Sequence, residues 1–196
     1  MSGSDPVSEL LAALSAELAR LGSRWYLFGA QAVVLWGRPR LTADVDVTVE
    51  LELDAVPGLV AALEGRGFEL RVRRDVNEFV TRTRVLPLWH RTSGLQLDLV
   101  LAGPGLEEAF LERAVLVDIG GVAIPVIAPE DLVVTKVLAG RPKDLEDVRG
   151  LLAERRDRLD ADAIRATLRL LEEALGQSDL LPVFETEWHR ASGPPG

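Results

Sequence analysis

The chain has 196 residues, of which 47% are hydrophobic and 27% are charged, so it can bury a core without disulfides. It contains no cysteine and only two histidines, which excludes thiolate chemistry and disfavours a zinc centre built from histidine. The formal net charge of -9 argues against a general nucleic-acid coat. With no secretory signal and no apolar run long enough for a membrane span, we expect a cytoplasmic protein without a membrane partner.

Hydrophobic periodicity predicts an α+β protein with a mixed sheet and a helical C-terminal part. We expect helices over 6–21, 31–36, 54–65 and 107–114, and strands over 25–28, 41–50, 68–73, 85–89, 95–101, 115–119 and 122–127. Three more helices are predicted over 129–139, 143–154 and 160–175. The sequence thus divides into a core with its N-terminal helix over 1–127, a helical region over 128–183 and a flexible tail over 184–196.

Acidic side chains share the polar face of two predicted strands. Asp44 and Asp46 alternate with valines in DVDV, and Asp98 alternates with leucines in LQLDLVL. Carboxylates gathered in an apolar sheet repel one another unless a cation lies between them, and oxygen ligands suit Mg²⁺ or Mn²⁺. The alternative is that these side chains line the solvated face of a half-open sheet, which is common in proteins.

Two further features of the sequence are typical of a phosphate-binding site. Gly29 follows an apolar strand and precedes a short helix, whose first backbone N–H groups can hold an anion. Of the 22 basic residues 20 are arginine, and the two lysines, Lys136 and Lys143, lie within eight positions of each other. A phosphate chain that requires a compact ammonium group would explain them, and chance is the equal alternative.

Two segments resemble a known family. FGAQAVVLWGRPRLTADVDV is similar to the signature of the nucleotidyltransferase superfamily that includes polymerase beta, and the Asp in LQLDLV fits its third carboxylate. With PEDLVVTKVLAGRPKDLEDVRGLL, the similarity narrows to the AbiEii-type nucleotidyltransferases, the toxin halves of type IV toxin–antitoxin systems. It covers roughly residues 25 to 153. The resemblance implies a mixed-sheet nucleotidyltransferase fold with flanking helices and a small C-terminal helical region.

The resemblance also implies roles for individual residues. Asp44, Asp46 and Asp98 would be the catalytic metal ligands, with Asp98 the candidate base. The implied substrate-binding residues are Gly29, Ala30, Arg40, Thr42, Lys136, Arg141, Lys143 and Asp144. A structural salt-bridge cluster at a helix junction is the alternative for Arg141, Lys143 and Asp144, and it is favoured for Asp147. Arg40 faces the phosphates or pairs with a carboxylate, and the sequence does not choose.

One departure from the family pattern leaves two functions open. Ala30 stands where many superfamily members carry a serine that contacts the phosphates. The first hypothesis is a toxin-like, Mg²⁺- or Mn²⁺-dependent enzyme that transfers a nucleoside monophosphate from an NTP to a hydroxyl of RNA, protein or a small molecule, with a cognate antitoxin as partner. The alternative is a catalytically weakened member that binds a nucleotide or a protein partner through the same fold.

The segment from Arg66 to Arg91 is rich in arginine. It holds seven arginines and three acidic residues, which gives it a local charge of +4. One interpretation is a landing surface for an RNA or protein acceptor, and the other is a set of solvated strand faces in an arginine-rich composition. We expect Phe28, Trp36 and Trp89 to lie in the core rather than to stack on bases.

Overall fold

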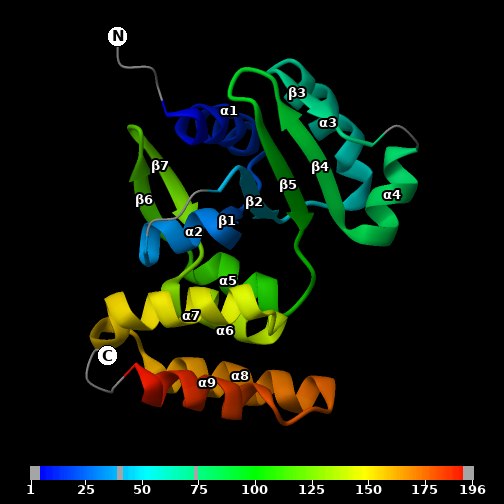
Figure 1. The fold of residues 1–196 in the computed structure, drawn as a ribbon. Helices are drawn as coiled ribbons and strands as arrows, with labels where there is room; N and C mark the ends of the chain where they lie inside the picture. The colour runs from blue at the N-terminus through cyan, green and yellow to red at the C-terminus, as the bar shows by residue number, and fades with distance from the viewer. Residues whose placement is uncertain (1–4, 39–41, 73–74, 192–196) are drawn as a thin grey trace. The chain divides into compact units, whose positions relative to one another are not determined.

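The computed structural model describes residues 5–38, 42–72 and 75–191 (Figure 1). The chain divides into two compact units. The first comprises Met1–Gln31 and Leu41–Ile127, and the second comprises Ala32–Arg40 and Ala128–Gly196. The expected α+β class with a mixed sheet is confirmed.

The strands of the first unit form one sheet, in the order β3-β4-β5-β2-β1-β7-β6. They are β1 (Trp25–Phe28), β2 (Asp44–Val49), β3 (Phe68–Leu70), β4 (Val85–His90), β5 (Leu95–Leu101), β6 (Val115–Ile119) and β7 (Val122–Val126). The β2–β5 and β1–β7 pairs are parallel and the other pairs are antiparallel, so the sheet is mixed. The helices of this unit are α1 (Pro6–Leu21), η1 (Leu53–Ala55), α3 (Val56–Glu64), α4 (Val76–Thr83) and α5 (Leu106–Arg113), with α2 (Gly29–Trp36) leading into the second unit.

One face of the sheet carries the core of the first unit. Alternation along β2 and β5 places Val45, Val47, Leu97 and Leu99 on this face, where all four are fully buried. Helix α1 contributes buried leucines at helical spacing, and it contacts α3, β5 and β7. Asp5 caps this helix by accepting a hydrogen bond from the Ser8 backbone N–H at 3.2 Å.

The opposite face of the sheet is apolar at one end and polar at the other. At the apolar end Tyr26 is buried and packs edge-on against Phe110 of α5, with ring centroids 6.4 Å apart. At the polar end lie Asp44, Gln96 and Asp98, which are exposed or half-buried. The carboxylates of the two strands therefore remain open to solvent and to a ligand within this unit.

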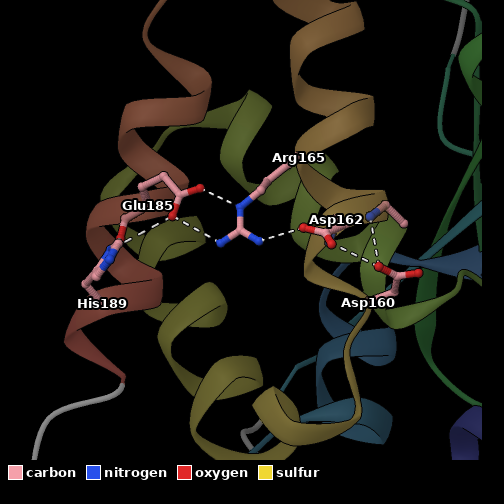
Figure 2. A network of polar contacts seen from close by, with 6 residues as sticks. Asp160, Asp162, Arg165, Glu185 and His189 are labelled. Carbon is pink, nitrogen blue, oxygen red and sulfur yellow. Dashed lines mark hydrogen bonds and ion pairs between the residues drawn. The ribbon is translucent and has the colours of Figure 1, made fainter.

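The second unit is helical. It contains α6 (Pro129–Ala139), α7 (Pro142–Arg155), η2 (Arg156–Arg158), α8 (Ala161–Leu175) and α9 (Leu180–Arg190). Figure 2 shows how Arg165 of α8 binds Asp162 on its own helix and Glu185 on α9, while Asp160 caps α8. Two helices are thus joined by one guanidinium group.

The structure differs from the predicted elements at several places. Helix α4 occupies the segment between β3 and β4, for which no helix or strand is predicted, and Asp75 caps it through the N–H groups of Asn77 and Glu78. Helix α9 extends to Arg190, inside the predicted tail, and Phe184 is fully buried, so residues 184–190 are part of the folded unit. Helix α2 begins at Gly29 rather than Gln31, and residues 32–38 group with the second unit.

Candidate active site on the sheet

The strand register places two of the predicted carboxylates side by side. Asp46 on β2 and Asp98 on β5 are direct partners in the parallel ladder, and Asp44 is the partner of Gln96. Residues in register on neighbouring strands point to the same face, about 4.8 Å apart along the ladder. Asp44 lies two positions from Asp46 and shares that face. The alternation in DVDV and LQLDLVL predicted the polar face of each strand, and the structure adds the register that makes Asp46 and Asp98 partners.

Gly29 lies directly against Asp46. Its φ of +65° is in the left-handed region, and a Cβ added there would lie 2.9 Å from Cβ of Asp46 and would overlap its carboxylate. Phe28, one residue earlier, is the ladder partner of Asp46 across β1 and β2. The turn from β1 into α2 therefore requires glycine for its backbone conformation and for the space that Asp46 occupies.

Arg71 holds the third carboxylate. Its Nη2 donates to Oδ1 of Asp98, its Nη1 donates to Oε1 of Gln96 at 2.5 Å, and its Nε donates to the Leu88 carbonyl at 3.1 Å. The Arg71 backbone N–H donates to the Pro87 carbonyl at 3.0 Å, which fixes the residue beyond the end of β3. Three parts of one guanidinium group are thus bound to two strands.

Arg71 is a site residue that the sequence did not single out. It was included only as one of the arginines between 66 and 91. The alternation along the strand is the feature that could have identified Arg71. Arg71 lies two positions after Glu69, which is the partner of Trp89, so both residues belong to the polar face of the sheet. That signal depends on strand pairing, which the sequence alone did not give for this short edge strand.

The carboxylates suit a divalent ion through their chemistry, although the predicted convergence of all three on one ion is not seen. Among residues 5–38, 42–72 and 75–191, no three His, Cys, Asp or Glu side chains are grouped closely enough to hold one metal ion. Mg²⁺ is usually held by one or two carboxylates together with substrate phosphates, so a pair such as Asp46 and Asp98, with Asp44 beside them, fits it.

Lys136, one of the implied substrate-binding residues, is engaged inside the protein. Its side chain is 10% exposed, and its Nζ lies 3.0 Å from Oδ1 of Asp144 and 2.7 Å from Oδ2 of Asp147. The ammonium group joins α6 to α7 inside the second unit. Binding a triphosphate would require it to leave two buried carboxylates.

The other residues of the second motif form part of the same cluster. Arg141 donates to Asp144 from Nε at 2.5 Å and from Nη2 at 3.2 Å. Burial by itself would raise the pKa of Asp144, but the hydrogen bonds from Arg141 and Lys136 outweigh burial and hold the pKa below its usual value. The favoured structural role of Asp147 matches its contact with Lys136, whereas Lys143 is exposed.

Three predicted substrate residues, Ala30, Arg40 and Thr42, lie between β1 and β2 in the sequence. Thr42 donates a long hydrogen bond of 3.5 Å from its hydroxyl to the Asp44 carbonyl. Ala30 is half-buried in the first turn of α2. Arg40 lies outside the described residues. Their roles toward a nucleotide stay predictions.

The arginine-rich segment is largely engaged within the protein. Arg66 binds Glu17 at 2.8 Å, Arg91 binds Glu69 at 3.2 Å, and Arg84 donates to the Ala102 carbonyl at 2.6 Å. Arg73 and Arg74 lie outside the described residues.

The expectation that all three aromatic residues lie in the core is wrong for Trp89. This residue is 38% exposed on the face that carries Gln96, its ladder partner. Phe28 and Trp36 are half-buried.

Solved structures show the same fold at low sequence identity. The antibiotic-resistance factor ANT(2'')-Ia matches with 16% identity and a TM-score of 0.55, over 88% of this chain and 96% of that chain. An antigenic nucleotidyltransferase-like protein from Paracoccidioides brasiliensis matches with 16% identity and a TM-score of 0.56, over 93% of each chain. A complex of ANT(2'')-Ia with adenylyl-2''-tobramycin matches with a TM-score of 0.55 and 16% identity, over 92% of this chain and 98% of that chain.

No curated protein sequence matches the chain. None of the helices in the described parts is long and apolar enough to cross a membrane. A family model described as "Nucleotidyltransferase of unknown function (DUF6036)" matches residues 7–175, which include the sheet, its carboxylates and the α6–α7 cluster. The narrower similarity to AbiEii-type toxins stays a prediction. Because the family model matches residues 7–175, the chain belongs to the DUF6036 family of nucleotidyltransferases.

Proposed function

We propose that this protein transfers a nucleoside monophosphate from an NTP to a hydroxyl group of an acceptor, using Mg²⁺ or Mn²⁺. The observation that carries the proposal is the register pair of Asp46 and Asp98, with Asp44 on the same face and Gly29 against Asp46. Family membership supports the reaction class. The acidic, oxygen-only donor set supports a hard divalent ion.

In the proposed reaction the acceptor oxygen bonds to the α-phosphorus of the NTP. The bond from that phosphorus to the bridging oxygen breaks, and pyrophosphate leaves with its electron pair. Asp98 accepts the proton of the acceptor hydroxyl. Asp44, Asp46 and Asp98 would hold the divalent ions, which would neutralise the phosphate charge and lower the pKa of the attacking hydroxyl. The chain contributes positioning and electrostatics, with no covalent intermediate.

Gly29 has a separate role in the proposal. Because it carries no Cβ, the turn before α2 leaves room for a phosphate close to the backbone and to Asp46. Ala30 supplies no hydroxyl for that phosphate, so we expect one contact fewer than in members with serine. Arg40, Thr42, Arg141 and Lys143 remain proposed substrate contacts, and the proposal does not depend on them.

The acceptor and the biological role rest on sequence similarity. The resemblance to AbiEii-type proteins favours a toxin role with a cognate antitoxin, and an RNA or a protein would then be the acceptor. ANT(2'')-Ia, which shares the fold, has been solved with adenylyl-2''-tobramycin, and small hydroxylated antibiotics are therefore the third class of acceptor to test.

Mg²⁺-dependent release of pyrophosphate tests the proposal directly. Each of the four NTPs is incubated with tRNA, a protein extract or an aminoglycoside, and transfer is followed with an α-³²P label. Asp44→Asn and Asp46→Asn should lose both transfer and Mn²⁺ binding while they remain folded. Asp54→Asn removes an exposed carboxylate of η1 and should leave both unchanged. Retained NTP binding without transfer to any acceptor would favour the catalytically weakened alternative.

A further inference from the structure

We propose that Arg71 is a positioning residue for Asp98, an inference that rests on the proposed function. Arg71 binds one carboxylate oxygen of Asp98 and thereby fixes the orientation in which the other oxygen meets the divalent ion and the acceptor hydroxyl. Among the described residues, Arg71 alone binds the Asp98 side chain, and it does so at Oδ1.

The guanidinium group is well anchored for this task. It spans the Leu88 carbonyl on β4 and the Gln96 amide oxygen on β5 before it reaches Asp98. A planar fork bound at three points holds its partner in one direction, which a single ammonium group cannot do. The backbone bond from Arg71 to Pro87 adds a fourth fixed point at the start of the side chain.

Exposure leaves the carboxylate accessible while it is held. The Arg71 side chain is 31% exposed and that of Asp98 is 43% exposed. A buried pair would seal Asp98 from any ligand, but this pair lies at the open end of the sheet beside Asp46. Outer groups that orient a ligating carboxylate in this way typically change metal affinity by about 10- to 100-fold when they are removed.

A competing role for Arg71 makes the opposite prediction. If the guanidinium merely replaced the metal as counter-ion of Asp98, weakening it would free the carboxylate and strengthen metal binding. Arg71→Lys separates the two roles, because it keeps the positive charge near Asp98 and removes the three-point fork. The long-range repulsion felt by a divalent ion is therefore nearly unchanged in this variant, and orientation is the main difference.

The test is Mn²⁺ affinity of the full chain, measured by electron paramagnetic resonance with and without a non-hydrolysable NTP analogue. We expect Arg71→Lys to weaken Mn²⁺ binding by about tenfold. Gln96→Leu removes one anchor of Arg71 and should weaken binding in the same direction by a smaller factor. The matched control is Arg24→Lys, which breaks a bidentate pair with Glu50 in the same unit at 2.6 and 2.8 Å and should leave Mn²⁺ affinity unchanged.

Each result is decisive. Unchanged or tighter Mn²⁺ binding in Arg71→Lys overturns the positioning role. If Arg71→Lys does not fold, Gln96→Leu decides by the same criterion. Asp46→Asn distinguishes failure of the proposed function, since Mn²⁺ binding that survives in this variant would refute the metal site itself. Loss of binding in Asp46→Asn with no change in Arg71→Lys would refute only the inference about Arg71.

Discussion

The ammonium nitrogen of Lys136 lies 2.7 Å from Oδ2 of Asp147, and this contact joins α6 to α7 within the second unit. The same nitrogen lies 3.0 Å from Oδ1 of Asp144, a residue with no exposed surface. One lysine therefore compensates two buried carboxylates, and among the described residues Arg141 is the other cation bound to Asp144. The charge of Lys136 is part of the fold of this unit.

Replacing Lys136 with methionine should destabilise the protein strongly. The side chain would still fill the space, but Asp144 and Asp147 would lose their shared cation. Removal of one partner of a buried ion pair typically costs about 3–5 kcal/mol. Urea unfolding measures the loss. Lys143→Met is the matched control, because the second lysine is exposed and its replacement should cost within about 0.5 kcal/mol. Equal stability of the two variants would show that Lys136 is not a structural residue.

Gly29→Ala should damage the fold and the site together. The positive φ alone costs roughly 1–2 kcal/mol for a residue with a Cβ. At Gly29 the added methyl group also overlaps the Asp46 carboxylate, so Asp46 must move. We expect a larger loss of stability than φ explains and weaker Mn²⁺ binding, measured by urea unfolding and titration calorimetry.

The control for this prediction is Gly22→Ala. Gly22 has nearly the same φ, +68°, but nothing lies within 4 Å of the position of its Cβ. It should show only the backbone cost and normal Mn²⁺ binding. If both variants lose the same stability and both bind Mn²⁺ normally, Gly29 does not act through Asp46.

The sheet was predictable because its strands carry strict alternation. In DVDV each valine is fully buried and each aspartate lies on the polar face. The two-residue alternation of a strand therefore identifies both the core residues and the candidate carboxylates. The same regularity in LQLDLVL placed Asp98 on the polar face. The glycine turn at residue 29 was also visible in the sequence, because a glycine at the junction of a strand and a helix indicates a backbone conformation that side chains with a Cβ rarely adopt.

Two features could not be predicted from the sequence. Asp75 caps α4 through two backbone N–H groups, but the helix has eight residues, which is too short for periodicity alone to separate a helix from a strand or a loop. The burial of Lys136 depends on Asp144 and Asp147, which lie on another helix and reach it only after α6 and α7 pack. A sequence shows a lysine on a helix, but not which face its partners will cover.

The stability of the protein should fall as the pH drops through the range just below 6.5. His90 is buried, and burial lowers its pKa from the usual 6.5, with a partial opposing effect of Glu9 and of the Arg66 backbone. A histidine with a lower pKa in the folded state takes up more protons in the unfolded state, so protonation favours unfolding. His90 thus contributes stability above pH 6.5 that is lost as the pH falls.

Urea midpoints at about pH 7.5 and about pH 5.5, on either side of the ordinary histidine pKa, test the role of His90. The wild type should lose stability between these values, and His90→Gln should lose less. The variant is less stable overall, because it lacks the histidine ring, whose centroid lies 4.5 Å from that of the Phe68 ring. Carboxylates with lowered pKa values do not interfere, because they titrate below this range. An identical pH dependence in both proteins would assign the effect to other groups.

Arg165→Met should loosen α8 from α9 by removing the charge that joins them (Figure 2). Arg165 donates to Glu185 at 2.6 and 3.3 Å and to Asp162 at 3.0 Å, and its side chain is 24% exposed. Methionine keeps the contact with the ring of Trp188, which the guanidinium now faces at 5.7 Å, so the loss is mainly electrostatic. For a partly exposed network we expect a cost of about 1–2 kcal/mol, measured by urea unfolding.

The same variant should change the titration of Glu185. The hydrogen bond from Arg165 is the largest cause of the lowered pKa of Glu185, so this pKa should rise toward its ordinary value of 4.5 in Arg165→Met. In the wild type the pair stabilises the protein above that value and loses its effect as the pH falls through the lowered pKa. An NMR titration of Glu185 in both proteins measures the shift, and an unchanged pKa in Arg165→Met would show that Arg165 does not hold Glu185 in solution.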